Sequence, residues 1–133
     1  MKKTLLLLIL TVFLTACSSD DDGGSSSNSS INPPEWIQGT WLTIYSNDPL
    51  IAGPGYRFLS NDFCYVNGST VTCQAEIIEL GGLNVEEIIT DTEYELKIGS
   101  TSSTTFNFIK INDTTIEFVS PISELLNITY TKQ

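Results

Sequence analysis

Apolar and polar residues alternate one by one through much of the chain after residue 31. Tyr94, Leu96 and Ile98 alternate with three charged residues, and a single amide residue separates Phe106 from Phe108. Because successive side chains of a strand point to opposite faces, this period of two predicts half-buried antiparallel strands. We expect eight or nine of them, at 40–46, 55–60, 62–67, 70–78, 85–90, 93–99, 104–111, 115–119 and 127–132.

Turn-forming residues interrupt this alternation at short intervals, for example at Asn67-Gly68 and Gly99-Ser100. Short strands with such spacing are typical of β-sandwiches and β-barrels. Consecutive hairpins favour an up-and-down barrel, because a Greek key needs longer cross-connections. The stretch from Glu76 to Glu87 is ambiguous and allows a short helix. We therefore expect an all-β fold, a small antiparallel up-and-down β-barrel of eight to nine strands.

The start of the chain has a different pattern, two lysines followed by an apolar run from Leu5 to Leu14. A membrane span needs roughly 20 apolar residues, so this run is too short to be one but suits a secretory signal peptide. It ends in Leu14-Thr15-Ala16-Cys17, which resembles the lipobox of bacterial lipoproteins. The resemblance implies that residues 1–16 are a signal peptide and that Cys17 carries a lipid, which would anchor the protein to a membrane without spanning it.

Residues 17–30 follow as a Ser/Asp/Gly-rich tether with no apolar residue after Cys17, so they cannot contribute to a core. Asp20-Asp21-Asp22 resembles the acidic surface-export signal of Bacteroidota lipoproteins, which implies an outer-membrane protein exposed on the cell surface. A solvated linker in a periplasm-facing lipoprotein is the alternative. Calcium binding is disfavoured, because three adjacent aspartates lack the alternating spacing of a calcium loop. The folded domain is then expected to occupy residues 31–133.

Composition excludes several classes of function. The chain has 16 acidic and 6 basic residues, a net charge of -10, which argues against nucleic-acid binding. It has no histidine, which removes the commonest general base and zinc ligand and every Ser-His or Cys-His pair. Glu86, Glu87, Asp91 and Glu93 could supply a glycosidase pair, although a solvated strand face also explains them. We expect no catalysis, no metal and no cofactor.

Two cysteines flank a hairpin whose register decides whether they meet. A type I′ turn at Asn67-Gly68 places Cys64 opposite Val71, whereas a type II′ turn at Gly68-Ser69 places it opposite Cys73. In the second register the two cysteines form a non-hydrogen-bonded pair with Cα atoms roughly 4.5 Å apart, within the range that a disulfide spans. An exported protein meets an oxidising compartment, so we expect this register and a Cys64–Cys73 disulfide.

Residues 34–41, which end in Gly39-Thr40-Trp41, resemble the opening of lipocalin-like domains. With 39–41, 61–64, 90–94 and 129–133 as the matching segments, the whole mature chain is similar to the small lipocalin-like lipoproteins of Bacteroidota, of the flavobacterial type. In this family Gly-x-Trp opens the first strand, which implies that Gly39 and Trp41 plug the closed end of the barrel. Lipocalins set an arginine against that tryptophan. The only arginine here is Arg57, and Lys132 is the candidate substitute.

The resemblance also implies a lid, because the first strand connection of a lipocalin folds over the open mouth. Leu50 and Ile51 in this connection are candidate portal residues, with Leu80 and Leu83 opposite. The alternative is that these four residues complete a filled core. Two functions remain open: a module for a small apolar or glycan-derived ligand, or a non-catalytic surface interaction protein, such as an adhesin, complex subunit or inhibitor, built on a filled barrel.

A last motif concerns covalent modification. Asp113-Thr114-Thr115 matches the short pattern at which Bacteroidota attach O-linked glycans to exported proteins. This implies a glycan on Thr114, and a plain hairpin turn at Asn112-Asp113 is the alternative.

Overall fold

The computed structural model describes residues 30–44 and 52–133. In these ranges the chain forms nine strands, one α-helix and one 3-10 turn. The elements are β1 (Gly39–Ile44), β2 (Ala52–Leu59), β3 (Asp62–Asn67), β4 (Thr70–Cys73), α1 (Ala75–Gly81), β5 (Asn84–Ile89), β6 (Glu93–Gly99), β7 (Ser103–Asn112), β8 (Thr115–Phe118), η1 (Glu124–Leu126) and β9 (Ile128–Lys132).

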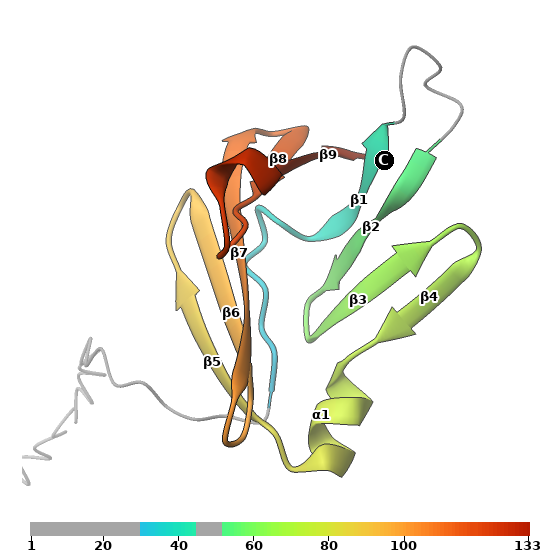
Figure 1. The fold of residues 1–133 in the computed structure, drawn as a ribbon. Helices are drawn as coiled ribbons and strands as arrows, with labels where there is room; N and C mark the ends of the chain where they lie inside the picture. Colours follow the sequence, from blue (N-terminus) through green and yellow to red (C-terminus); the bar gives the residue numbers. More distant parts are fainter. Residues whose placement is uncertain (1–29, 45–51) are drawn as a thin grey trace, which may run out of the picture.

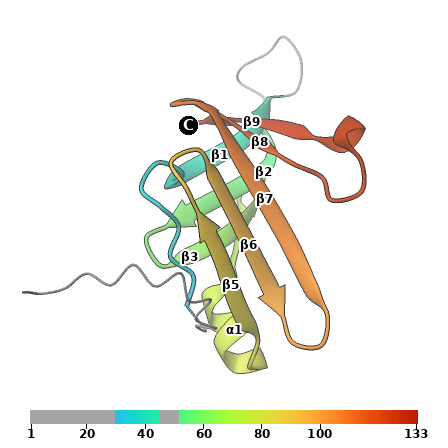
Figure 2. The ribbon, with the colours of Figure 1, turned by 90° about the vertical axis from the view of Figure 1, so that its left-hand side faces the viewer.

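All nine strands belong to one antiparallel sheet, in the order β4-β3-β2-β1-β9-β8-β7-β6-β5. The sheet consists of two successive meanders, β1 to β4 and β5 to β9, joined where Trp41 of β1 lies opposite Lys132 of β9. It curls into a half-barrel, with β4 and β5 as its two edges (Figures 1 and 2). The predicted all-β antiparallel class and the succession of hairpins are confirmed.

One expected strand, 70–78, is wrong beyond Cys73. The chain turns there into α1, because Ala75–Gly81 is rich in good helix formers and Gly82 ends the helix at a φ of 59°. The Gly82 and Leu83 amides donate back to carbonyls of the last turn. Of the two neighbouring isoleucines in this helix, Ile78 is buried and Ile77 is half exposed. The short helix allowed for this stretch is the correct alternative, although it begins one residue earlier.

The N-terminal segment of the described domain packs along the β5 edge (Figure 2). Ile31 and Ile37 are fully buried in the core. The Asn32 amide donates to Glu87 Oε1 of β5 at 2.9 Å, and Trp36 Nε1 donates to the Thr90 carbonyl at 2.9 Å. These contacts hold the segment against the sheet before it enters β1, so the apolar side chains of the segment add to the core of the half-barrel.

Candidate functional site

Nine aromatic side chains make contact on the inner face of the curled sheet. They come from alternate positions of β2, β3, β6, β7, β8 and β9, and a period of two places such positions on one face. We call them the aromatic cluster. Its members are Tyr56, Phe58, Phe63, Tyr65, Tyr94, Phe106, Phe108, Phe118 and Tyr130.

The cluster bridges the two meanders across the interior. Phe63 of β3 and Phe106 of β7 have ring centroids 5.1 Å apart, and Phe58 of β2 lies 5.1 Å from Phe108 of β7. Neither pair of strands is adjacent in the sheet, so these contacts cross the space that the sheet encloses. The inner space between these strands is therefore occupied by rings.

Tyr56 is the centre of the cluster. Its ring contacts six others and lies edge-on to Phe108 and Tyr130, at 5.1 Å from each. Burial, followed by the neighbouring Tyr130, raises the pKa of Tyr56 well above its ordinary value. The phenol therefore keeps its proton and remains a neutral hydrogen-bonding group within an apolar surrounding.

The cluster becomes exposed on one side. Phe63 and Phe108 are fully buried, whereas Tyr65 is 38% exposed and Tyr56 and Phe118 are half-buried. We call Tyr56, Tyr65 and Phe118 the aromatic rim, because Tyr56 contacts both of the others. Burial raises the pKa of Tyr65 to about 12. The rim thus offers ring faces and neutral hydroxyls, groups that suit apolar or ring-shaped ligands.

The predicted portal residues lie in different places. Leu50 and Ile51 are outside the described residues. Leu80 is on α1 and is 81% exposed, while Leu83 packs against the core. The alternation of aromatic residues in β2 and β3 places these rings on one face, but it does not indicate that three of them form an exposed rim.

The predicted barrel plug is buried beside the joint between β1 and β9. Trp41 is 1% exposed, and its Nε1 donates to the Ile37 carbonyl. Lys132 Nζ lies 5.1 Å from the centre of the Trp41 ring. A side chain on Gly39 would meet the Lys132 Cε at 2.9 Å, so the glycine leaves room for the lysine to reach the ring. Arg57 of β2 lies opposite Thr40 and donates from Nε to Thr40 Oγ1 at 3.0 Å.

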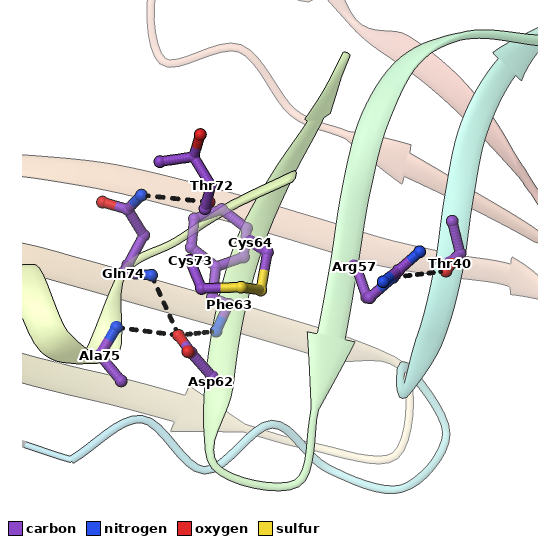
Figure 3. Close-up of a disulfide and its surroundings, with 9 residues drawn as sticks. All are labelled: Thr40, Arg57, Asp62, Phe63, Cys64, Thr72, Cys73, Gln74 and Ala75. Carbon is purple, nitrogen blue, oxygen red and sulfur yellow. Dashed lines mark hydrogen bonds between the residues drawn. A yellow bond between two sulfur atoms is a disulfide. The ribbon is translucent and has the colours of Figure 1, made fainter. Parts of the chain in front are cut away.

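The predicted disulfide is confirmed, together with its hairpin register. Cys64 lies opposite Cys73, with Cα atoms 3.9 Å apart, and the two sulfurs are bonded (Figure 3). The turn is Gly68-Ser69, and Gly68 has the positive φ of 61° that a type II′ turn needs at its first central residue.

Asp62 lies beside the disulfide and joins β3 to the start of α1. One of its oxygens, Oδ1, accepts hydrogen bonds from the amides of Phe63, Gln74 and Ala75 at 2.7, 3.1 and 2.9 Å (Figure 3). Asp62 and the two cysteines are the one group of potential metal ligands in the described ranges. Because both sulfurs are in the disulfide, the group offers no thiolate for a metal.

The four candidate carboxylates have separate environments. Glu87 accepts from the Tyr94 hydroxyl at 2.6 Å and from the Asn32 amide, and Glu93 accepts from Asn107 Nδ2 at 3.0 Å. Burial, followed by the hydrogen bond to Glu87, raises the pKa of Tyr94. Glu86 and Asp91 are exposed. Glu87 and Glu93 thus accept hydrogen bonds from residues of neighbouring segments, which is a structural role.

Two further features lie on the surface. Thr114 is exposed in the β7–β8 turn and donates from Oγ1 to Asn112 Oδ1 at 3.0 Å.

A polar cavity of about 170 Å³ lies at the other end of β7, among residues that the sequence did not group as a site. It is lined by Asn84, Glu86, Lys97, Gly99, Ser100, Thr101, Ser102 and Ser103. Cys17 and Asp20 to Asp22 lie outside the described residues.

Comparison with known proteins does not identify the function of this site. No family model, curated protein or solved structure matches the chain. Within the described ranges, no helix has the length and apolar character needed to span a bilayer.

Proposed function

We propose that this chain is a non-catalytic lipoprotein of the outer membrane, anchored through Cys17 and exposed on the cell surface. Its domain is a lipocalin-like up-and-down barrel that binds a small apolar or glycan-derived ligand at the aromatic rim. The observation that carries the binding proposal is Tyr65, which is 38% exposed although its ring packs on the buried rings of Phe63 and Phe106.

The chemistry of the rim supports such a ligand. A ring that lies on Tyr65 would cover apolar surface, and the tyrosine hydroxyls would offer hydrogen bonds at its edge. The cluster contains no charged side chain, so an uncharged ligand loses less solvation there than an ion would. This combination suits a planar apolar molecule or the apolar face of a sugar.

A second function is favoured by the ring contacts between β3 and β7. Because rings occupy the interior there, a ligand would lie on the rim and not deep inside. A filled domain of this kind also suits a surface interaction protein that uses its sheet as a scaffold. In that case the rim would contact a protein, and the small ligand would be absent.

Titration with 1-aminoanthracene, an apolar fluorophore, tests the rim in the purified full chain. We expect binding, and Tyr65→Ala should weaken it roughly five- to tenfold, the value of one lost ring contact. Val71→Ala is the matched control, because Val71 is equally exposed on β4 but lies on the opposite face of the sheet. Equal affinity of both variants would contradict a site at the rim.

Tyr65→Phe separates the two ligand classes. Loss of the hydroxyl should leave 1-aminoanthracene binding unchanged. It should weaken the binding of labelled glycans if the natural ligand is glycan-derived, because a hydroxyl partner is lost. Loss of 1-aminoanthracene binding in Tyr65→Phe would show that the effect of Tyr65→Ala comes from altered folding.

The anchor and the sorting signal are tested separately. Cys17→Ser should leave a precursor or a protein that no longer enters the detergent phase, because the anchor is covalent. Full partitioning of this variant into the detergent phase would contradict lipidation.

Replacing Asp20, Asp21 and Asp22 with alanine should keep the lipid but reduce the cleavage of the protein by protease added to whole cells. Equal cleavage of this variant and the unaltered protein would show that the acidic run is a plain linker.

A further inference from the structure

The β8–β9 connection presents aliphatic side chains to water. Ile122 is 85% exposed and Leu125 95%, the two largest values among the exposed apolar residues of the described chain, and Leu126 is 54% exposed. We call Pro121, Ile122, Leu125 and Leu126 the apolar tip. Figure 2 shows this turn, in red, at the outer end of β8 and β9, away from the other strand connections. A concentration of exposed aliphatic groups on one projecting turn indicates a binding surface.

The backbone amides of the apolar tip are already satisfied from within the same turn. Leu126 N donates to the Ser123 carbonyl at 2.9 Å, and Asn127 N donates to the Glu124 carbonyl at 3.2 Å. Side-chain oxygens of Ser120 and Ser123 accept from the amides of Ile122 and Leu125, each at 3.3 Å.

The base of the turn is closed in the same way. Asn127 Oδ1 accepts from the Ser120 amide at 3.0 Å, and its Nδ2 donates to Glu117 Oε1 at 3.1 Å. Pro121 has no amide hydrogen.

Entry into an apolar phase requires that backbone donors be paired internally, because the hydrocarbon of a lipid offers no acceptor. The apolar tip meets most of this requirement before any partner arrives.

The side-chain chemistry of the apolar tip favours lipid over a protein partner. The exposed groups are aliphatic, and the residues from 119 to 127 include no aromatic residue and no arginine, the types that dominate protein interfaces. Glu124 is the one charged residue in this stretch, and no lysine accompanies it. An interaction through the tip would therefore depend on apolar contact and very little on salt or on anionic lipid.

The anchor would keep the whole domain close to a bilayer. Thirteen residue steps separate Cys17 from Ser30 in the sequence, and a chain of that length spans at most about 45 Å. A domain held so close to a membrane meets it at a high effective concentration, so a small apolar contact is enough to orient it.

We propose that the apolar tip inserts into the outer leaflet of the bilayer that carries the lipid anchor, as a second contact that orients the domain. This inference rests on the proposed lipid anchor. The aliphatic side chains would reach the boundary between headgroups and acyl chains, the depth usual for apolar faces at an interface.

Fluorescence quenching by brominated phosphatidylcholine tests the docking in the acylated full chain, reconstituted into vesicles of that lipid. Leu125→Trp places an indole in the apolar tip. Leu80→Trp is the matched control, because Leu80 is also a highly exposed leucine but lies on α1. Trp36 and Trp41 are present in both variants, so their emission cancels in the comparison. Flotation of each variant with the vesicles reports the anchor independently.

We expect both variants to float and only the indole at position 125 to lose roughly half or more of its emission, at low and at high salt, because acyl-chain bromines lie near the interface. Flotation without selective quenching would overturn the docking and leave the anchor standing. A blue shift at position 125 without quenching would show that a second copy or another protein covers the tip, and would also overturn it. Failure to float would overturn the anchor, and the docking with it.

Discussion

Lys132 lies over the indole of Trp41, with its Nζ 5.1 Å from the ring centre, and the two residues face each other across β1 and β9. This pair stands at the one joint between the two meanders of the sheet. A large buried ring and a cation therefore hold together the first and last strands of the described chain. Lys132, the substitute expected for an arginine, is the residue that lies against the ring.

Removal of the indole should be the most damaging single change at this joint. Trp41→Ala should lower the free energy of unfolding by about 3–5 kcal/mol, because it empties a fully buried site. Lys132→Met should cost only about 0.5–1 kcal/mol, the value of a partly exposed cation–π contact. Trp36→Ala is the control and should cost less than Trp41→Ala. A loss below about 1 kcal/mol for Trp41→Ala in urea melts would contradict the prediction that Trp41 is a barrel plug.

The disulfide gives the second prediction. In a Cys17→Ser background, which leaves only Cys64 and Cys73, a thiol titration of the denatured, non-reduced protein should find no thiol. Replacing both cysteines with alanine should cost about 2.7 kcal/mol, because the bond closes a loop of about ten residues. Two reactive thiols in the titration would contradict both the bond and the hairpin register.

Asp62 gives the third prediction, because one carboxylate oxygen holds three amides at the junction of β3 and α1. Asp62→Ala should cost about 2–3 kcal/mol, since hydrogen bonds to a charged acceptor are lost together. Asp62→Asn keeps an acceptor oxygen and should cost about half as much. Asp91→Ala, in an exposed turn, should change stability by less than about 0.5 kcal/mol. Equal losses for Asp62→Ala and Asp91→Ala in urea melts would contradict the junction.

Alkaline pH should unfold the protein through its buried tyrosines. Burial raises the pKa of Tyr65 to about 12 and those of Tyr56 and Tyr94 further. Above pH 10 the unfolded chain loses these phenolic protons while the folded chain keeps them, so stability is complete below about pH 10 and falls as the pH rises.

Urea melts between pH 9 and 12, with absorbance at 295 nm, measure this effect. Phenolate should appear together with unfolding, and Tyr65→Phe should make the fall of stability with pH less steep. A stability that does not change over this range would contradict the burial of these hydroxyls.

The strands could be predicted because local alternation specifies them. The range predicted for 62–67 is that of β3, and Tyr94, Leu96 and Phe108 all point inward as their period requires. The error at 70–78 has a non-local cause. Two adjacent isoleucines suit a strand, but the Asp62 side chain, distant in the sequence, accepts from the Gln74 and Ala75 amides where the helix begins.

The candidate site could not be predicted, because it depends on how the sheet curls. Alternation places Tyr65 and Phe106 on a face, but it does not state that β3 and β7 meet across the interior. The apolar tip was also missed, because Leu125 and Leu126 resemble core residues in the sequence. Only the fold shows that they project into water.

Native mass spectrometry of the protein released from its own membrane tests the central claim most directly, because one spectrum reports the anchor and the ligand together. We predict a chain that begins at Cys17, carries acyl groups, and holds a small molecule that is absent from the Tyr65→Ala variant. A chain that retains residues 1–16 would contradict the account of a lipid-anchored binding domain. An acylated chain that carries no small molecule in either form would contradict it too.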